Sequence, residues 1–544
     1  MVALSMADGY ARLTGKPQCV LVHVDVGTQG LGAAVHNASC GRAPVLIFAG
    51  LSPYTQEGEH RGSRTEYIHW IQDVPDQKQI VAQYCRYTAE LKTGRNVKQI
   101  VNRALQFATS APAGPVYVYG AREVMEQEIE PYQIEQSHWG PVGPAALPQD
   151  AVETIAAGLV AAQKPLVIVG YSGRKAQGAT ELVKLADTVP GIRVLDTGIC
   201  DMCFPADHPS SVGWRYGVHD AIKTADFILV LDCDVPWIPT QCAPSPSAKI
   251  YHIDSDPLKQ QMPVFYIPSL GTYRADSAIA LKQLTEYISG RQDFMQTIQT
   301  TEYASRRAAL EAEHKQRLES IAKLAAAPSD PNAPLNPAYL ISQVRRACPV
   351  DTIWCVEAVT LSPIVAENIQ ATIPNSFINC GGGGLGWSGG AALGVKLATD
   401  DQHGGRGKGK FVCQIVGDGT YLFSVPGSVY WIARRYNIPV LTIVLNNKGW
   451  NAPRRSLLLV HPDGRGSRAT NEEINISFAP TPDYAGIAKA AAGGELWAGR
   501  AGTVWELAKA LPEAVQSVVN GKGAVLEAQL DGKEGKYTGE ERKN

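Results

Sequence analysis

The most informative stretch of the chain reads Phe411-Val-Cys-Gln-Ile-Val-Gly-Asp-Gly419, and a second apolar run, residues 440–445, is followed by Asn446-Asn447. One helix is predicted between the two runs, over residues 429–436. A strand–helix–strand unit of this size brings the carboxyl ends of two parallel strands to the same edge of a sheet. We therefore expect the aspartate and the second asparagine to lie together at the edge where α/β sheets bind ligands.

These side chains have the chemistry of a magnesium–diphosphate site. One carboxylate and one amide oxygen are hard donors, which suit Mg²⁺ because it keeps phosphate oxygens and water as its other ligands. Gly417 and Gly419 let a phosphate approach the backbone, and amides at the next helix start can point at it. Each motif alone also fits an ordinary turn. Together, each after a buried strand, they predict a metal–diphosphate site.

With this spacing, the two motifs resemble the cofactor motif of thiamine diphosphate-dependent enzymes, in the superfamily of acetohydroxyacid synthase and benzoylformate decarboxylase. The resemblance implies that Asp418, Asn447 and the main-chain oxygen of Gly449 bind Mg²⁺. It also implies that Thr420, with the two glycines of the first motif, contacts the diphosphate. The implied cofactors are thiamine diphosphate and Mg²⁺.

A glycine-rich loop adds to this resemblance. Gly381-Gly-Gly-Gly-Leu-Gly-Trp-Ser-Gly-Gly-Ala-Ala-Leu-Gly394 is similar to the family's loop that enters a helix of small residues. The resemblance implies that Leu385 wedges under the cofactor and bends it, and that the carbonyl of Gly383 accepts a hydrogen bond from its amino group. A flexible glycine loop is the alternative. Residues 357–360 resemble a second diphosphate-contacting turn, with Thr360 as the expected donor.

The amino-terminal segment resembles the substrate side of the same family. Asp8-Gly-Tyr-Ala-Arg-Leu-Thr-Gly15 resembles the pyrimidine-domain signature, and His23-Val-Asp-Val-Gly-Thr-Gln-Gly-Leu-Gly32 resembles the strand and loop beside the substrate. His23 falls where benzoylformate decarboxylases place an active-site histidine, and a buried structural histidine is the alternative. Asp25 and Gln29 replace residues that are usually small, so we expect them to face the substrate. His23, Gln29 and Leu385 are the catalytic candidates.

The family activates its cofactor with a glutamate that protonates the pyrimidine ring. By the same alignment this glutamate would lie immediately before Met1. We expect the native protein to begin roughly fifty residues earlier, given typical domain sizes. A non-catalytic paralogue that lacks the activating glutamate and retains diphosphate binding is the alternative.

Short β-rich runs alternate with helical patterns in three segments, which is the signature of parallel α/β domains. We expect the α/β class with three doubly wound parallel-sheet domains. The resemblance makes them a pyrimidine-binding domain (residues 1–138, without its first elements), a central domain (149–290) and a diphosphate-binding domain (336–531). The expected strands are residues 19–24, 45–49, 115–118, 165–169, 193–196, 227–231, 249–253, 352–356, 411–416, 440–445 and 524–528.

Composition excludes some classes of partner. The formal net charge of −2 with scattered Lys and Arg disfavours nucleic acid, and no apolar run is long enough to span a membrane. Eleven cysteines at irregular spacing favour a reducing compartment, so we expect a cytoplasmic protein. The resemblance implies a homodimer or homotetramer.

Acetohydroxyacid synthases carry FAD in the central domain, but the glycine and arginine pattern for it is not evident around residues 213–220 or 232–239.

We expect a carboligase or lyase that acts on 2-keto acids or 2-hydroxyacyl compounds and is similar to acetolactate synthase. A 2-keto acid decarboxylase similar to benzoylformate decarboxylase is the alternative. It is disfavoured because the histidine pair of pyruvate decarboxylases is not found, and because the segment Val235-Pro-Trp-Ile-Pro239 lacks the central-domain histidine of benzoylformate decarboxylases. A nicotinamide-dependent dehydrogenase is disfavoured because no Gly-x-Gly-x-x-Gly follows a strand in the middle segment.

Overall fold

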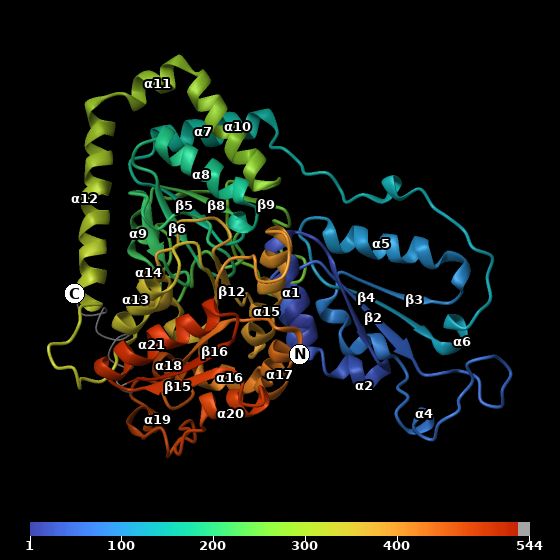
Figure 1. Ribbon diagram of the computed structural model, residues 1–544. Helices are drawn as coiled ribbons and strands as arrows, with labels where there is room; N and C mark the ends of the chain where they lie inside the picture. Colours follow the sequence, from blue (N-terminus) through green and yellow to red (C-terminus); the bar gives the residue numbers. More distant parts are fainter. Residues whose placement is uncertain (531–544) are drawn as a thin grey trace. The chain divides into compact units, whose positions relative to one another are not determined.

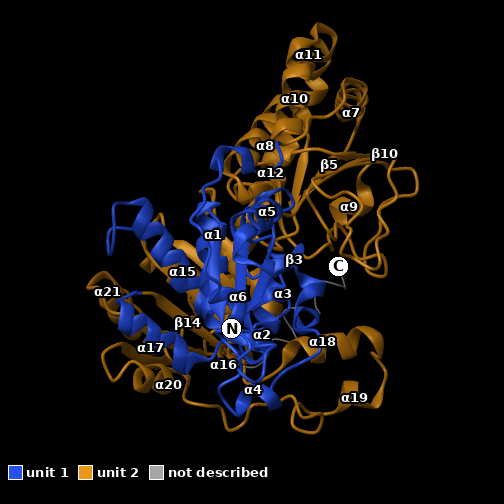
Figure 2. Cartoon of the chain, turned by 90° about the vertical axis from the view of Figure 1, so that its right-hand side faces the viewer, with its two compact units in different colours: residues 1–143, 380–410, 422–439 blue, residues 144–379, 411–421, 440–544 orange. Residues whose placement is uncertain are grey.

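A computed structural model describes residues 1–530 (Figure 1). The chain forms two compact units, which Figure 2 shows in different colours. Unit 1 comprises residues 1–143, 380–410 and 422–439, and unit 2 comprises the other described residues. The three expected domain boundaries stay a prediction, and residue 531, the expected end of the third domain, lies outside the described residues.

All strand pairs in the three sheets are parallel, which confirms the expected fold class. The strand orders are β1-β2-β4-β3 in unit 1 and β10-β9-β8-β5-β6-β7 and β12-β11-β13-β14-β16-β15 in unit 2. The strands are β1 (Gln18–Val22), β2 (Val45–Leu51), β3 (Tyr87–Leu91), β4 (Val116–Ala121), β5 (Pro165–Val169), β6 (Arg193–Asp196), β7 (Ser211–Trp214), β8 (Phe227–Leu231), β9 (Lys249–Asp254), β10 (Gly271–Arg274), β11 (Ile353–Glu357), β12 (Phe377–Asn379), β13 (Val412–Gly417), β14 (Leu441–Asn446), β15 (Trp497–Ala501) and β16 (Ala524–Gln529).

Helices connect these strands, as parallel pairing requires. They are α1 (Val2–Thr14), α2 (Val24–Gln29), α3 (Gly32–Cys40), α4 (Ile68–Ile71), α5 (Val97–Thr109), α6 (Arg122–Met125), α7 (Gln149–Ala161), α8 (Ala176–Thr188), α9 (Asp220–Thr224), α10 (Ser277–Gly290), α11 (Gln292–Ile298), α12 (Thr301–Leu324), α13 (Pro337–Ala347), α14 (Ser362–Ile369), α15 (Trp387–Gln402), α16 (Asp418–Phe423), α17 (Pro426–Tyr436), α18 (Asn451–Val460), α19 (Arg465–Arg468), α20 (Tyr484–Ala491) and α21 (Val504–Val519). Among residues 1–530, none of these helices has the length and apolar character needed to cross a membrane.

In unit 1, helix α1 packs closely on helix α15 because both carry small residues at the contact. A Cβ on Gly9 would lie 2.3 Å from the carbonyl oxygen of Ala391, and one on Gly394 would lie 1.9 Å from that of Met6. Real Cβ atoms do not approach an oxygen this closely, so only glycine permits the contact. The small residues in the stretch 381–394 therefore allow α1 and α15 to pack closely, in addition to forming the glycine-rich loop.

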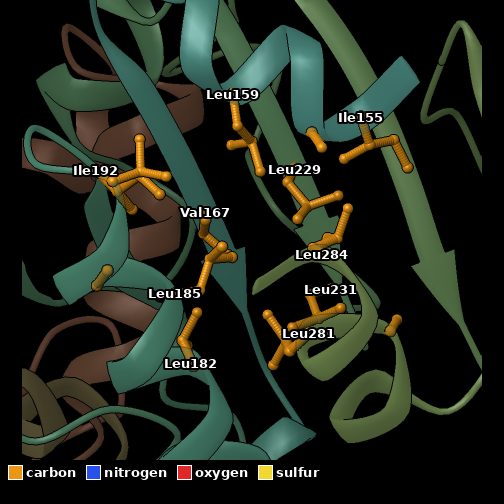
Figure 3. Close-up of a cluster of buried hydrophobic side chains, with 14 of the residues drawn as sticks. Ile155, Leu159, Val167, Leu182, Leu185, Ile192, Leu229, Leu231, Leu281 and Leu284 are labelled. Atoms are coloured by element: carbon orange, nitrogen blue, oxygen red, sulfur yellow. The ribbon is translucent and has the colours of Figure 1, made fainter. Parts of the chain in front are cut away.

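In unit 2, the central sheet is buried on both faces. Val167 and Val169 of β5 face a core cluster with α7, α8 and α10, whereas the alternate residues Leu166 and Ile168 belong to a second cluster. Figure 3 shows the first cluster, in which leucines of β8 and α10 meet those of α7 and α8. A strand that is covered on both faces has a continuous apolar sequence. The runs at residues 165–169, 193–196 and 227–231 accordingly coincide with β5, β6 and β8.

Two local expectations differ from the structure. The strand expected over residues 19–24 ends at Val22, and Val24 opens helix α2 with a positive φ of 40°. The single helix expected between the two cofactor motifs is preceded by a short one, α16, which begins at Asp418 itself. Weak helix formers conceal both helical turns in the sequence pattern: valine and glycine in α2, and Asp418, Gly419 and Thr420 in α16.

Candidate functional site

The two cofactor motifs end neighbouring strands in unit 2. β13 pairs in parallel with β14, with Gly417 opposite Leu445. The residues that follow these strands, Asp418 and Asn447, therefore emerge at the same edge of the sheet. Both strands are buried along almost their whole length because neighbouring strands and helices cover them. The edge expected from the sequence is thus formed by a buried part of the core.

Asp418 is a buried carboxylate at this edge. Its Oδ1 accepts a hydrogen bond from the nitrogen of Gly419 at 2.7 Å, and its Oδ2 accepts one from the nitrogen of Gly449 at 3.2 Å. Burial raises the pKa of Asp418 to about 6, and these backbone hydrogen bonds partly offset that rise. A cation beside the carboxylate would favour its charged form. A buried carboxylate beside main-chain and amide oxygens therefore fits a hard divalent ion.

Gly449 is held by a short stretch of backbone pairing. The nitrogen of Trp450 donates to the carbonyl oxygen of Ile476 at 2.8 Å, and the nitrogen of Phe478 donates to that of Lys448 at 2.9 Å. A Cβ on Gly449 would lie 2.2 Å from the carbonyl oxygen of Ile476, so this position requires glycine. The pairing fixes the main chain that carries the third expected metal ligand.

The two glycines of the first motif have different surroundings. A Cβ on Gly419 would lie 2.3 Å from the ring of Trp450, which itself packs edge-on against Phe478 at 4.8 Å between centroids. A Cβ on Gly417 would meet only Oγ1 of Thr420, at 3.8 Å. The backbone of Gly417 is thus open to an approaching group, while Gly419 is required for packing. Thr420 is itself buried, 4% exposed.

Sequence reasoning missed a carboxylate beneath this edge. Glu527 of β16 is fully buried and accepts hydrogen bonds from Nδ2 of Asn446 at 2.8 Å and from Nε of Arg500 at 3.1 Å. Oδ1 of Asn446 in turn accepts from the nitrogen of Lys448 at 3.1 Å. The sequence did contain a signal for this role, a lone glutamate inside the apolar run at residues 524–528. A buried carboxylate needs a hydrogen-bonding or charged partner, so it could have been expected to hold a neighbouring group.

The turn that carries Thr360 has a strained backbone. After β11 the chain enters a 3₁₀ turn, Val359–Leu361, with a positive φ of 47° at Val359. This region is unfavourable for a β-branched residue and costs on the order of 1–3 kcal/mol. Such strain concentrates at functional sites, and Thr360 is half-buried beside it. The geometry supports a functional turn at this position.

In unit 1, helix α3 holds the glycine-rich loop. Nδ2 of Asn37 donates to the carbonyl oxygen of Gly384 at 2.5 Å, and the nitrogen of Gly384 donates back to Oδ1 of Asn37 at 3.0 Å. The nitrogen of Gly383 donates to Nε2 of His36 at 3.3 Å. Leu385 is half-buried, and Gly383 is exposed. These hydrogen bonds tether the loop at Gly383 and Gly384, which favours an ordered cofactor loop over the alternative of a flexible glycine loop.

His23 and Gln29 lie at the two ends of helix α2, in unit 1. His23 is the residue before the helix and is exposed, so the alternative of a buried structural histidine is wrong. Gln29 is also exposed, and its Nε2 donates to Oδ2 of Asp25 at 3.2 Å. Asp25 is buried, and among residues 1–530 its Oδ1 has no hydrogen-bond partner. The histidine and the glutamine are accessible to a ligand.

The crevice of the central sheet, between β5 and β8, is lined by charged groups that satisfy one another. Lys259 is buried and pairs with Asp234 at 2.8 Å and, more closely, with Asp254. The hydroxyl of Tyr171 donates to Asp234 at 2.9 Å. A dinucleotide would bind at this switch point in an open α/β sheet. The expectation against FAD in the central domain stays a prediction.

Comparison with protein families gives three matches in chain order. The N-terminal TPP binding domain of thiamine pyrophosphate enzymes matches residues 1–80, and the central domain of these enzymes matches residues 152–271. Their C-terminal TPP binding domain matches residues 358–527, which contain both cofactor motifs. The matched regions fall in the three segments expected from the sequence pattern.

Individual relatives are distant. The chain is 24% identical to the benzoylformate decarboxylase of Pseudomonas aeruginosa over 83% of this chain and 78% of that protein. It is 23% identical to the acetolactate synthase isozyme 3 large subunit of Escherichia coli over 98% of this chain and 87% of that protein. The solved structure of benzoylformate decarboxylase from Polynucleobacter necessarius shares the fold, with a TM-score of 0.75, 19% identity, and coverage of 97% of this chain and 90% of that one.

Proposed function

Because this chain belongs to the thiamine pyrophosphate enzyme family, we propose that it is a thiamine diphosphate- and Mg²⁺-dependent carboligase or lyase acting on 2-keto acids or 2-hydroxyacyl compounds. The observation that carries the cofactor assignment is the hydrogen bond from the nitrogen of Gly449 to the buried carboxylate of Asp418. It joins the ends of two adjacent parallel strands. When bound, thiamine diphosphate supplies a nucleophilic carbon that adds to a carbonyl group.

The residues of unit 2 hold the metal and the diphosphate in this proposal. Asp418, the side-chain oxygen of Asn447 and the carbonyl of Gly449 bind Mg²⁺. The open backbone at Gly417, the hydroxyl of Thr420 and the strained turn at Thr360 contact the diphosphate, with Gly419 packing beneath. The buried carboxylate, the fixed main chain and the open glycine support these roles.

The proposal assigns the reacting end of the cofactor to the glycine-rich loop and to helix α2. The carbonyl of Gly383 orients the amino group of the pyrimidine ring, and Leu385 holds the cofactor bent. The clamp from α3 supports this role because it leaves the loop few alternative conformations. His23 and Gln29, both exposed at the ends of α2, contact the substrate, where His23 holds or moves a proton at an imidazole nitrogen.

Decarboxylation of a 2-keto acid without ligation is the second candidate. The exposed position of His23, at the end of β1, favours it, because an accessible imidazole can return a proton to the product and end the reaction there. A carboligase would instead release its product only after a second carbonyl compound has reacted. The two candidates therefore differ in their dependence on an acceptor.

The distinguishing experiment measures carbon dioxide and ligated product from a panel of 2-keto acids, with and without an aldehyde or second keto acid, in the presence of thiamine diphosphate and Mg²⁺. The same enzyme is given 2-hydroxyacyl compounds to test cleavage. Ligated or cleaved product supports the first proposal, and carbon dioxide with aldehyde alone supports the second. No turnover of any of these compounds, in a protein that binds the cofactor, would contradict both.

We also propose that the protein works as a homodimer or homotetramer in the cytoplasm. Tyr67, Trp70 and Ile71 are large apolar side chains with exposures of 80%, 47% and 63%, close together along the chain of unit 1. Such a group is suited to contact with a second copy. None of the eleven cysteines, which all lie within residues 1–530, forms a disulfide, as is usual in a reducing compartment. Light scattering during size-exclusion chromatography measures the assembly, and a monomer would contradict it.

A further inference from the structure

A small cavity of about 50 Å³ lies within unit 2, beside the β6–β7 edge of the central sheet and away from the crevice between β5 and β8. Helices α12 and α14 and strand β12 complete its wall. Two backbone hydrogen bonds tie opposite sides together: Met202 donates to Phe377 at 3.2 Å, and Ala206 donates to Ala371 at 3.0 Å. The cavity is therefore preformed by main-chain contacts.

Arg317 of α12 brings a guanidinium group to this cavity. Its Nε and Nη2 atoms are shielded from solvent, and among residues 1–530 neither has a hydrogen-bond partner. The group reaches this place because residue 213 is glycine: a Cβ there would lie 3.1 Å from Nη1 of Arg317. Arg317 as a whole is half-buried, but shielding two of its nitrogens from water without hydrogen-bond acceptors is costly, so the position favours an anion that the described chain does not supply.

The nearby carboxylates do not fill this need. Glu367 of α14 lines the cavity, but its Oε1 pairs with Nη1 of Arg215 at 2.5 Å. Asp196 also lines it, and its two oxygens accept hydrogen bonds from the nitrogens of Gly198 and Cys203 at 2.7 and 2.8 Å. Burial lowers the pKa of Arg317, and Glu367 partly opposes this. Glu367 is thus paired with Arg215 and Asp196 is held by main-chain nitrogens, and among residues 1–530 neither carboxylate forms an ion pair with Arg317.

Ser211 and Gln370 also line the cavity, and the rest of its wall is mostly apolar. Phe204, Trp214 and Phe377 line the cavity with exposures of 4%, 8% and 3%. A single water needs about 10–15 Å³ of such space, so the cavity takes a ligand of about four or five non-hydrogen atoms. The Nε–Nη2 edge of a guanidinium presents two parallel donors, which match the two oxygens of a carboxylate. A phosphate fits less well because it has no apolar side for the aromatic wall.

We propose that this cavity is a binding site for a small monocarboxylate, with its carboxylate on Arg317 and its alkyl group against the aromatic wall. The site is separate from the proposed cofactor site, because none of the residues that line it belongs to the two cofactor motifs. It would let the enzyme sense a short-chain acid.

The test is calorimetric titration of the cofactor-loaded enzyme with acetate and propionate, and with acetamide and propionamide as uncharged isosteres. The carboxylates should bind and the amides should bind at least about tenfold more weakly. Arg317→Met should weaken propionate binding at least about tenfold, whereas Lys315→Met, which removes an exposed charge from the same helix, should leave it unchanged. Asp418→Ala and the native chain, both titrated without cofactor, should bind propionate equally, which separates this site from the cofactor site.

Two further measurements keep the proposal falsifiable if Arg317→Met alters folding. Without carboxylate, Arg317→Met should unfold at the same temperature as the native chain or higher, because it removes an uncompensated buried charge. Ala371→Leu, which keeps the guanidinium and fills the cavity, should abolish propionate binding. Unchanged propionate binding in either variant, tighter binding of inorganic phosphate than of propionate, or a lower unfolding temperature of Arg317→Met would overturn the proposal.

Discussion

The side-chain amide of Asn446 donates a hydrogen bond to Oε1 of Glu527 over 2.8 Å, and both side chains are fully buried. Through its own oxygen, Asn446 accepts a hydrogen bond from the nitrogen of Lys448 at 3.1 Å. A carboxylate on β16 thus orients an amide on β14, and that amide fixes the first turn of the segment carrying Asn447 and Gly449. The proposed metal ligands depend on a carboxylate that does not touch the metal.

The first prediction concerns Glu527→Ala. It leaves the buried amide of Asn446 without its acceptor, so the free energy of unfolding should fall by about 3 kcal/mol. Cofactor affinity in the presence of Mg²⁺ should fall about 10-fold, as for other residues that orient metal ligands. Urea unfolding and calorimetry measure the two effects. The exposed Glu513→Ala should change stability by less than about 0.5 kcal/mol, and equal effects of the two variants would contradict the role of Glu527.

A pair of glycine variants tests the loop. Gly386 has a φ of 101°, and a Cβ on it would lie 2.3 Å from the carbonyl oxygen of Phe423. Gly386→Ala should therefore destabilise the protein by about 2–4 kcal/mol. Gly383→Ala is the matched control in the same loop, because its Cβ would meet no atom within 4 Å. It should unfold like the native protein and still bind cofactor, since the proposed contact uses its main-chain carbonyl. Loss of binding there would contradict that contact.

The third prediction concerns Leu385. Leu385→Ala should slow the exchange of the thiazolium proton of bound thiamine diphosphate for deuterium by about 10- to 100-fold, because a small misplacement of reacting groups has effects of this size. Cofactor affinity should change much less. Leu385→Met, which conserves volume, should exchange at close to the native rate. An unchanged exchange rate in the alanine variant would show that Leu385 serves only loop packing.

The fourth prediction concerns pH. Burial raises the pKa of Asp196 to about 7. Hydrogen bonds from the nitrogens of Cys203 and Gly198 act in the opposite direction but are the smaller effect. The folded state therefore holds this proton more tightly than the unfolded state, and the contribution of Asp196 to stability is lost as pH rises from about 4 to 7, by roughly 4 kcal/mol in total. In urea unfolding, the stability of Asp196→Asn relative to the native chain should rise with pH across this window. A constant difference would contradict the raised pKa.

Much of the fold was predictable because parallel sheets bury both faces of a strand. Apolar runs such as residues 227–231 therefore mark strands almost to the residue, and two such runs placed Asp418 and Asn447 at one edge. Short strands with mixed burial, such as β10 (Gly271–Arg274), escaped prediction because they lack a continuous apolar run. Helix α2 escaped because valine and glycine dominate it.

The contacts that complete the candidate site were not predictable because they join distant parts of the chain. Asn37 clamps Gly384 across 347 residues of sequence, and neither residue carries a local pattern that specifies the other. Glu527 approaches Asn446 only because β14 and β16 are neighbours. Residue types indicated which groups have the right chemistry, and tertiary packing determined which of them are held in place.

The most direct measurement of the cofactor assignment is calorimetric titration of Asp418→Ala with thiamine diphosphate in the presence and absence of Mg²⁺. The native chain should bind the cofactor in a Mg²⁺-dependent manner. The variant should lose more than about 100-fold in affinity, because it lacks the only buried carboxylate of the proposed metal set. The exposed Asp463→Ala should bind like the native chain. Native-like, Mg²⁺-dependent affinity in a folded Asp418→Ala protein would contradict the proposed site.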